Sequence, residues 1–253
     1  MRIIKGFIGA VVCYVLFSSF TLAGDCPDKN DPKAGINLHF KNYVDSLYKI
    51  SQAAESGLCK KVFEKAMVGY YNVKALNDSR LKEPILSIID YTQKSTDKRL
   101  WVIDLISGRL LYNTLVAHGK NSGDQYAEHF SNELSSNMSS IGFFITGEIY
   151  NGKHGESMAL DGLDKGFNDH VRQRSVVMHA ADYVTEDFID KIGRIGRSQG
   201  CPAVPPKFAG PIISTIANGS CLFVYYPDEN YQRSTNLLNL NTAVSSFSGI
   251  KSN

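Results

Sequence analysis

One cysteine, in the stretch "GRSQGCPAVPP", has surroundings that suit a nucleophile. The thiolate is the reactive form, so a catalytic cysteine needs neighbours that help it to ionise. Arg194 and Arg197 lie just upstream of Cys201. Pro202 can occupy the first position of a helical turn, whose positive end would then face the sulfur. Gly200 lets the backbone bend and lets a substrate approach closely. The pattern predicts a candidate nucleophile in a stiff loop; the competing interpretation is a tight turn into a helix.

Acyl transfer also needs donors for an oxyanion. Pro202 has no N–H, so the backbone donors must come from Cys201, Gly200 or Gln199. The residues alone leave all three of these amides as candidates.

A cysteine nucleophile needs a base from elsewhere in the chain, and histidine is the usual choice. His179 ends the apolar run "SVVM" and precedes Cys201 by 22 residues. His118 ends a second apolar run, in "LVAHGKNSG", and is a rival for the base. His154 and His170 lie in predicted loops that could line a cleft. His179 is the preferred base, with His118 and His154 as candidate substrate-binding residues.

The N-terminus predicts the compartment. Arg2 and Lys5 precede an apolar run of 14 residues, and small residues follow up to Ala23. This pattern is typical of a secretory signal peptide over residues 1–23. A membrane span needs about 20 apolar residues, so a retained anchor is the weaker alternative. We expect an exported protein, periplasmic or secreted, with no membrane span after cleavage.

Cleavage would remove two of the 27 basic residues and none of the 25 acidic ones, which leaves the mature chain formally neutral. A neutral chain gives no argument for nucleic-acid binding. The sequence contains no H-E-x-x-H, C-x-x-C or H-x-H spacing, so no metal site is predicted.

Export makes disulfides the default for the cysteines that remain. Four would be left in the mature chain, and four cysteines allow three connectivities. Pairing Cys26 with Cys59 would tie the mature N-terminus to a helix. Cys221 begins the predicted buried strand "CLFVYY", where a free cysteine usually packs as a small apolar side chain. This arrangement leaves Cys201 free; the alternative is a bond between Cys201 and Cys221.

The elements that must position these residues change character along the chain. Residues 37–76 carry apolar residues at helical spacing on both sides of Gly57, which predicts a helical hairpin. Strand patterns then dominate, with a two-residue hairpin expected at Ser107-Gly108. Two helices are expected later, at 186–193 and 206–218. The predicted division is 1–23 signal peptide; 24–83 helical segment; 84–226 catalytic domain; 227–253 polar, disordered tail.

Together, "HAADYV" followed by "GRSQGCPAVP" resembles the active-site signature of L,D-transpeptidases with a YkuD-type catalytic domain. Other stretches, including "VAHGKNSG" and "RQRSVVMHAADYV", resemble the murein L,D-transpeptidase-like branch. The resemblance covers roughly residues 84–226.

The resemblance implies a mainly β catalytic domain, a YkuD-like β-sandwich with few helices, so that the chain is α+β overall. It implies Cys201 as nucleophile, His179 as base, Gly200 and Cys201 as oxyanion donors and Ser198 as a residue that shapes the site. Peptidoglycan stem peptides would be the substrate, with D-alanine released and a thioester left on Cys201. No metal or organic cofactor is implied.

One residue departs from the family pattern. Many members carry an arginine two positions after the cysteine, where this chain has Ala203. Arg197 or Arg194 would then have to bind a substrate carboxylate. An L,D-carboxypeptidase, another cysteine amide hydrolase and a non-catalytic wall-binding protein remain as alternatives, and the sequence does not predict the oligomeric state.

Overall fold

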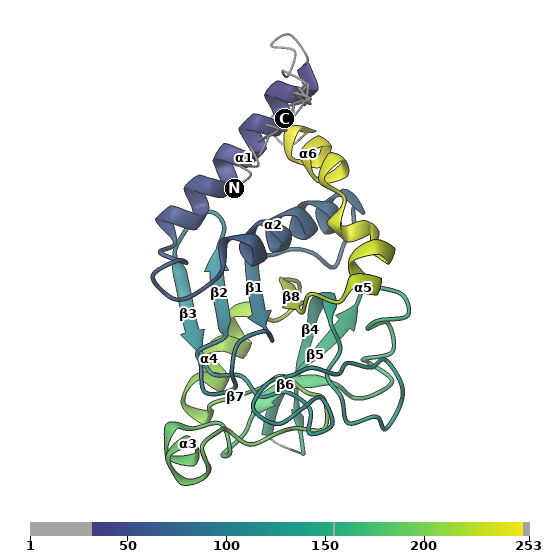
Figure 1. The fold of residues 1–253 in the computed structure, drawn as a ribbon. Helices are drawn as coiled ribbons and strands as arrows, with labels where there is room; N and C mark the ends of the chain where they lie inside the picture. Colours follow the sequence, from purple (N-terminus) through teal and green to yellow (C-terminus); the bar gives the residue numbers. More distant parts are fainter. Residues whose placement is uncertain (1–31, 154, 250–253) are drawn as a thin grey trace, which may run out of the picture.

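The computed structural model describes residues 32–153 and 155–249 (Figure 1). The helices are α1 Pro32–Ile50, α2 Lys60–Ala75, α3 Glu186–Ile192, α4 Pro206–Ile216, α5 Glu229–Ser234, the 3-10 turn η1 Asn236–Leu238, and α6 Leu240–Gly249. The strands are β1 Ile85–Asp90, β2 Leu100–Asp104, β3 Leu110–Thr114, β4 Gly142–Gly152, β5 Gly155–Gly162, β6 Val177–Ala180, β7 Ala203–Val204 and β8 Cys221–Tyr225.

The strands form one hydrogen-bonded sheet in the order β3-β2-β1-β8-β4-β5-β6-β7. The pairs β1·β8 and β6·β7 are parallel, and the other neighbours are antiparallel. The fold class expected from the sequence, a β-rich catalytic domain with few helices behind an N-terminal helical segment, is confirmed. The sheet's ladder is continuous, with register shifts between β2 and β3 and between β4 and β5.

The expected helical hairpin is α1 and α2, and Gly57 lies between them at a positive φ of 85°. Helix α2 packs against the sheet at β1 and β8 (Figure 1). A Cβ on Gly69 of α2 would come within 1.8 Å of the Phe143 ring. Glycine therefore sets how closely α2 approaches the sheet.

The polar tail expected to be disordered is instead helical from 229 to 249, apart from short connections. Asn72 of α2 donates from Nδ2 to the carbonyls of Leu237 (2.8 Å) and Asn239 (2.9 Å). Phe247 of α6 is buried against the rings of Phe40 and Tyr71. The prediction was wrong because a few apolar residues on one face of α6 suffice to pack it, although the segment is mostly polar.

Two further expectations are corrected at the strands. The region between His154 and His170, predicted to consist of loops, contains β5, whose Met158 and Leu160 are buried. The connection between β2 and β3 is five residues long, because the Asp104 carboxylate accepts the N–H groups of Ile106 and Ser107 and widens the turn. Helices α3 and α4 occur where expected, and the Thr185 side chain caps α3 by accepting the Phe188 N–H.

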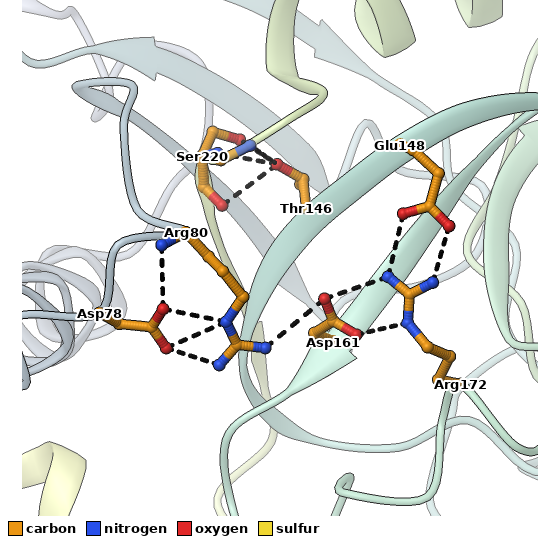
Figure 2. A network of polar contacts seen from close by, with 8 residues as sticks. Asp78, Arg80, Thr146, Glu148, Asp161, Arg172 and Ser220 are labelled. Atoms are coloured by element: carbon orange, nitrogen blue, oxygen red, sulfur yellow. Dashed lines mark hydrogen bonds and ion pairs between the residues drawn. The ribbon is translucent and has the colours of Figure 1, made fainter.

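A polar network joins the linker after α2 to the β4–β5 hairpin (Figure 2). Arg80 pairs with Asp78 in the linker and reaches Asp161 of β5 at 3.5 Å. Arg172 bridges Asp161 at 2.6 Å and Glu148 of β4 at 2.7 Å. Isolated exposed ion pairs contribute little, but this connected set links the linker to both strands of the β4–β5 hairpin.

The described cysteines, Cys59, Cys201 and Cys221, are free thiols. The alternative bond between Cys201 and Cys221 is therefore wrong: Cys221 is fully buried in β8. The expected bond from Cys26 to Cys59 and the signal peptide involve residues outside the described part of the chain. No helix within residues 32–153 and 155–249 is long and apolar enough to cross a membrane.

Candidate active site

A cavity of about 530 Å³ opens beside the ends of β5 and β6. The loop that carries Cys201 forms one wall, and the tip of the β4–β5 hairpin forms another. Four of the residues predicted from the sequence line it: Cys201, His179, Ser198 and Arg197. The fold thus brings together residues from β6 and from the loop before β7.

The side chain of Ser198 shapes the cysteine loop, residues 196–202. Its Oγ accepts the Gly200 N–H at 3.0 Å and donates to the Cys201 carbonyl at 2.7 Å. Gly200 adopts a φ of 119°, and a Cβ there would come within 2.6 Å of the Met138 carbonyl oxygen. Glycine is needed here for both reasons. Because Ser198 engages the Gly200 amide, the expectation that this N–H serves an oxyanion is corrected; the Cys201 amide remains the candidate donor.

The cysteine loop is also anchored from the segment after β3. Ser198 donates its N–H to the His118 carbonyl at 2.9 Å, and Lys120 donates its N–H to the Ser198 carbonyl at 2.8 Å. The loop is therefore pinned on both sides of Ser198, which holds Cys201 in one place.

The Cys201 sulfur is partly exposed and lies against the start of β6. It accepts the Val177 N–H at 3.5 Å and lies 3.7 Å from the Ser175 carbonyl oxygen. Burial raises the pKa of the Cys201 thiol, while the Val177 N–H and the charge of Arg174 oppose that rise. The helical turn expected at Pro202 is absent, because β7 begins at the next residue, Ala203, and α4 begins only at Pro206.

His179 lies in β6 and pairs in register with Ala203 of β7, two residues beyond Cys201. Its Nδ1 lies 2.7 Å from the Ala180 carbonyl oxygen. A carbonyl only accepts hydrogen bonds, so we assign the proton to Nδ1. This tautomer makes Nε2 the basic nitrogen of the ring, as a general base requires.

His118 does not reach the cavity. It is fully buried; Arg99 donates to its Nδ1 at 2.7 Å, and its Nε2 lies 3.4 Å from the Gly123 carbonyl oxygen. Burial, and next the charge of Arg99, lower the pKa of His118 to about 3. The expectation that His118 binds substrate, or competes as the base, is therefore wrong: its side chain supports the fold behind the cysteine loop.

The two arginines expected to bind a carboxylate share one partner. Arg194 pairs through Nε with Asp124 at 2.8 Å, and Arg197 pairs with the same carboxylate at 3.3 Å. Only Arg197 lines the cavity, where Nη1 also donates to the Gly123 carbonyl at 2.9 Å. His154 lies outside the described residues.

The lining residues that sequence reasoning missed include Lys153, Arg174 and Tyr183. Arg174 comes five residues before His179, in the stretch that carried the family resemblance, so its proximity to that histidine was a usable signal. Every charged side chain among the described lining residues is cationic, which suits a substrate carboxylate. The described residues contain no group of three or more His, Cys, Asp or Glu side chains placed to hold a metal ion.

Comparison with known proteins places this site in a family. Residues 54–225 match the family of the L,D-transpeptidase catalytic domain, and the chain belongs to that family. The match begins within the helical segment and includes α2. No curated protein matches the chain.

The solved structures similar to this chain include an L,D-transpeptidase from Mycobacterium smegmatis, 13% identical, with a TM-score of 0.35, 56% of this chain and 59% of that chain covered. L,D-transpeptidase 1 from Mycobacterium tuberculosis is 12% identical, with a TM-score of 0.32 and coverage of 57% and 62%. The Enterococcus faecium enzyme is 15% identical, with a TM-score of 0.34 and coverage of 57% and 50%. The chain thus spans less than two thirds of the length of these structures.

Proposed function

We propose that this chain is a peptidoglycan L,D-transpeptidase that acts through a cysteine thioester. The observation that carries the proposal is the shared cavity of Cys201 and His179, with the His179 ring held by the Ala180 carbonyl. Membership of the L,D-transpeptidase catalytic-domain family supports the same reaction class.

In the first half-reaction, Nε2 of His179 takes the proton of the Cys201 thiol. The thiolate attacks the carbonyl of the third residue of a stem peptide, and a C–S bond forms. The C–N bond to the terminal D-alanine breaks, and His179 returns the proton to the leaving amine. The Cys201 amide is the proposed donor to the oxyanion.

In the second half-reaction, the amine of a neighbouring stem attacks the thioester. A C–N bond forms, the C–S bond breaks, and the thiol is restored after His179 has accepted the proton of the amine. Arg197 and Lys153 are the cationic lining residues proposed to attract the substrate carboxylates before this step.

Mass spectrometry of the intact protein tests the nucleophile. We expect wild type and Cys59→Ala to form a covalent adduct with a carbapenem and with a tetrapeptide stem, and Cys201→Ala to form none. His179→Ala should slow acylation about 10²- to 10⁴-fold, the usual contribution of a positioned base. An adduct that persists on Cys201→Ala contradicts the assignment.

The same assay separates the acceptors. With a tetrapeptide donor and an amine acceptor, a transpeptidase yields a crosslinked product, whereas an L,D-carboxypeptidase yields only the hydrolysed tripeptide. Tripeptide alone, at saturating amine, would make the protein a hydrolase with the same Cys201–His179 pair.

We also propose that the protein is exported, to the periplasm or the exterior, and that residues 1–23 are removed. Three features of the sequence support this proposal: the basic residues near the N-terminus, the short apolar run, and the small residues that precede the expected cleavage site.

A further inference from the structure

Arg174, which was not singled out from the sequence, has a dense set of hydrogen bonds close to the cysteine loop. It lies just before β6 and lines the cavity with Cys201. Its guanidinium donates four hydrogen bonds to the serine loop, residues 131–140. They run from Nη1 to Ser131 O (2.6 Å) and Ser140 Oγ (2.6 Å), and from Nη2 to Ser136 Oγ (3.0 Å) and Met138 O (2.6 Å).

This clamp holds the serine loop directly against the cysteine loop. A Cβ built on Gly200 would lie 2.6 Å from Met138 O and 3.4 Å from Arg174 Nη2. Ser139 of the same loop donates from Oγ to the Gly200 carbonyl at 3.3 Å. Gly200, the residue before Cys201, is therefore packed against both Arg174 and the serine loop.

The charge of Arg174 is not cancelled by these bonds, because all four acceptors are neutral oxygens. Burial lowers the pKa of Arg174, and the charges of Cys201 and Glu133 oppose that shift. Arg194 and Arg197, by contrast, share the carboxylate of Asp124. Arg174 is thus the cation best placed to act on the sulfur.

The absence of the family's arginine at position 203 agrees with this distribution of positive charge. Ala203 is fully buried in a small apolar cluster with Leu115, Ala117 and Val184, among others. An arginine at that position would have to displace the cluster or bury an unpaired charge, which is costly. In this chain a cation, Arg174, approaches the cysteine loop from the segment before β6 instead.

We propose that Arg174 is a positioning residue for Cys201: it clamps the serine loop behind Gly200 and supplies the positive charge that favours the Cys201 thiolate. The inference rests on the proposed function of Cys201 as the nucleophile. It also predicts a property of the thiol that can be measured without turnover.

The test is the pH dependence of Cys201 alkylation by iodoacetamide, followed by peptide mass mapping so that Cys59 and Cys221 are scored separately. Arg174→Gln keeps hydrogen-bonding capacity but loses the charge. We expect it to raise the apparent pKa of Cys201 by about one unit, so that the alkylation rate at neutral pH falls about tenfold. Arg174→Lys keeps the charge and should restore most of the wild-type profile.

Two controls separate charge from structure. Arg172→Gln removes a nearby arginine that pairs with Glu148 and Asp161 outside this loop, and should leave the profile unchanged. The double variant Ser136→Ala/Ser140→Ala removes two hydrogen bonds of the clamp but keeps the charge of Arg174. It should leave the apparent pKa of Cys201 unchanged. If this double variant shifts the pKa as Arg174→Gln does, or if Arg174→Lys fails to restore it, the proposal is overturned.

Wild-type protein gives a second test should Arg174→Gln not fold. Raising the KCl concentration screens charges, so the apparent pKa of Cys201 should rise with salt; a constant value contradicts the proposal. Since alkylation needs no stem peptide, a shifted pKa without any acyl adduct would refute the transpeptidase and leave the role of Arg174 intact.

Discussion

His118 and His179 both follow short apolar runs, but the fold gives the two rings opposite surroundings. The His179 ring lines the cavity and presents Nε2 as its basic nitrogen. His118 is enclosed, and its Nδ1 accepts from Arg99 only while that nitrogen carries no proton. A neutral His118 is thus a condition for satisfying a fully buried arginine.

Protonation of His118 should make stability depend on pH. Its pKa is about 3 in the folded protein and about 6.5 in the unfolded chain. Between these values the unfolded chain binds a proton that the folded protein excludes, so the free energy of unfolding falls as pH falls. The slope is at most about 1.4 kcal/mol per pH unit. Urea unfolding at several pH values from neutral to about 5 measures it.

His118→Gln is the matched variant, since its amide oxygen can accept from Arg99 but does not titrate. We expect a flatter dependence on pH for this variant than for wild type. Equal slopes would show that His118 does not titrate in the way its burial implies.

The local sequence around Cys201 was informative because a Ser-x-Gly-Cys segment forms its own turn. Ser198 and Gly200 act within three residues of the cysteine, and that range is visible in sequence. Arg174 was missed because its role depends on where the serine loop lies, which only the tertiary fold determines. For the same reason, the residue patterns alone left His118 as a rival to His179, and the preference for His179 depended on the family resemblance.

At the scale of elements, helices with a clear apolar stripe, α1 and α2, were predictable, whereas β5 and α6 were not. Strand β5 has buried residues in succession and polar ends, so it lacks the alternation that marks a half-buried strand. Helix α6 gains its stability from contact with α2 and not from its own propensity, since an isolated helix of this length is marginal.

Phe247→Ala tests whether α6 is an integral part of the fold. Phe247 is 5% exposed and meets the rings of Phe40, Tyr43 and Tyr71. Truncation should lower the free energy of unfolding by about 3 kcal/mol, as for other buried phenylalanines. Chemical denaturation measures the loss.

Thr242→Ala is the control on the exposed face of α6 and should change stability by no more than about 0.5 kcal/mol. Similar losses in the two variants would mean that the Phe247 contacts do not stabilise the protein. Cys201 acylation by a carbapenem, measured well below the melting temperature, should be unchanged in both.

At the scale of the whole molecule, the proposed function requires export, because peptidoglycan lies outside the cytoplasm. We expect protein recovered from the periplasm or the medium to begin at Gly24, because the signal would be cut after Ala23. N-terminal sequencing and intact mass check this start. A protein that retains residues 1–23 in a membrane fraction would instead support an uncleaved anchor.

The contact between α6 and the first two helices also constrains the order in which the chain can fold. Helices α1 and α2 are synthesised before any strand of the sheet, yet Phe247 packs between them and is made after every strand. Contacts so distant in sequence slow folding, because a long loop must close before they can form. Within the emerging helical hairpin, Phe40 and Tyr71 can pack against each other but lack the Phe247 ring until the last helix has been made, which leaves part of this apolar surface uncovered during synthesis.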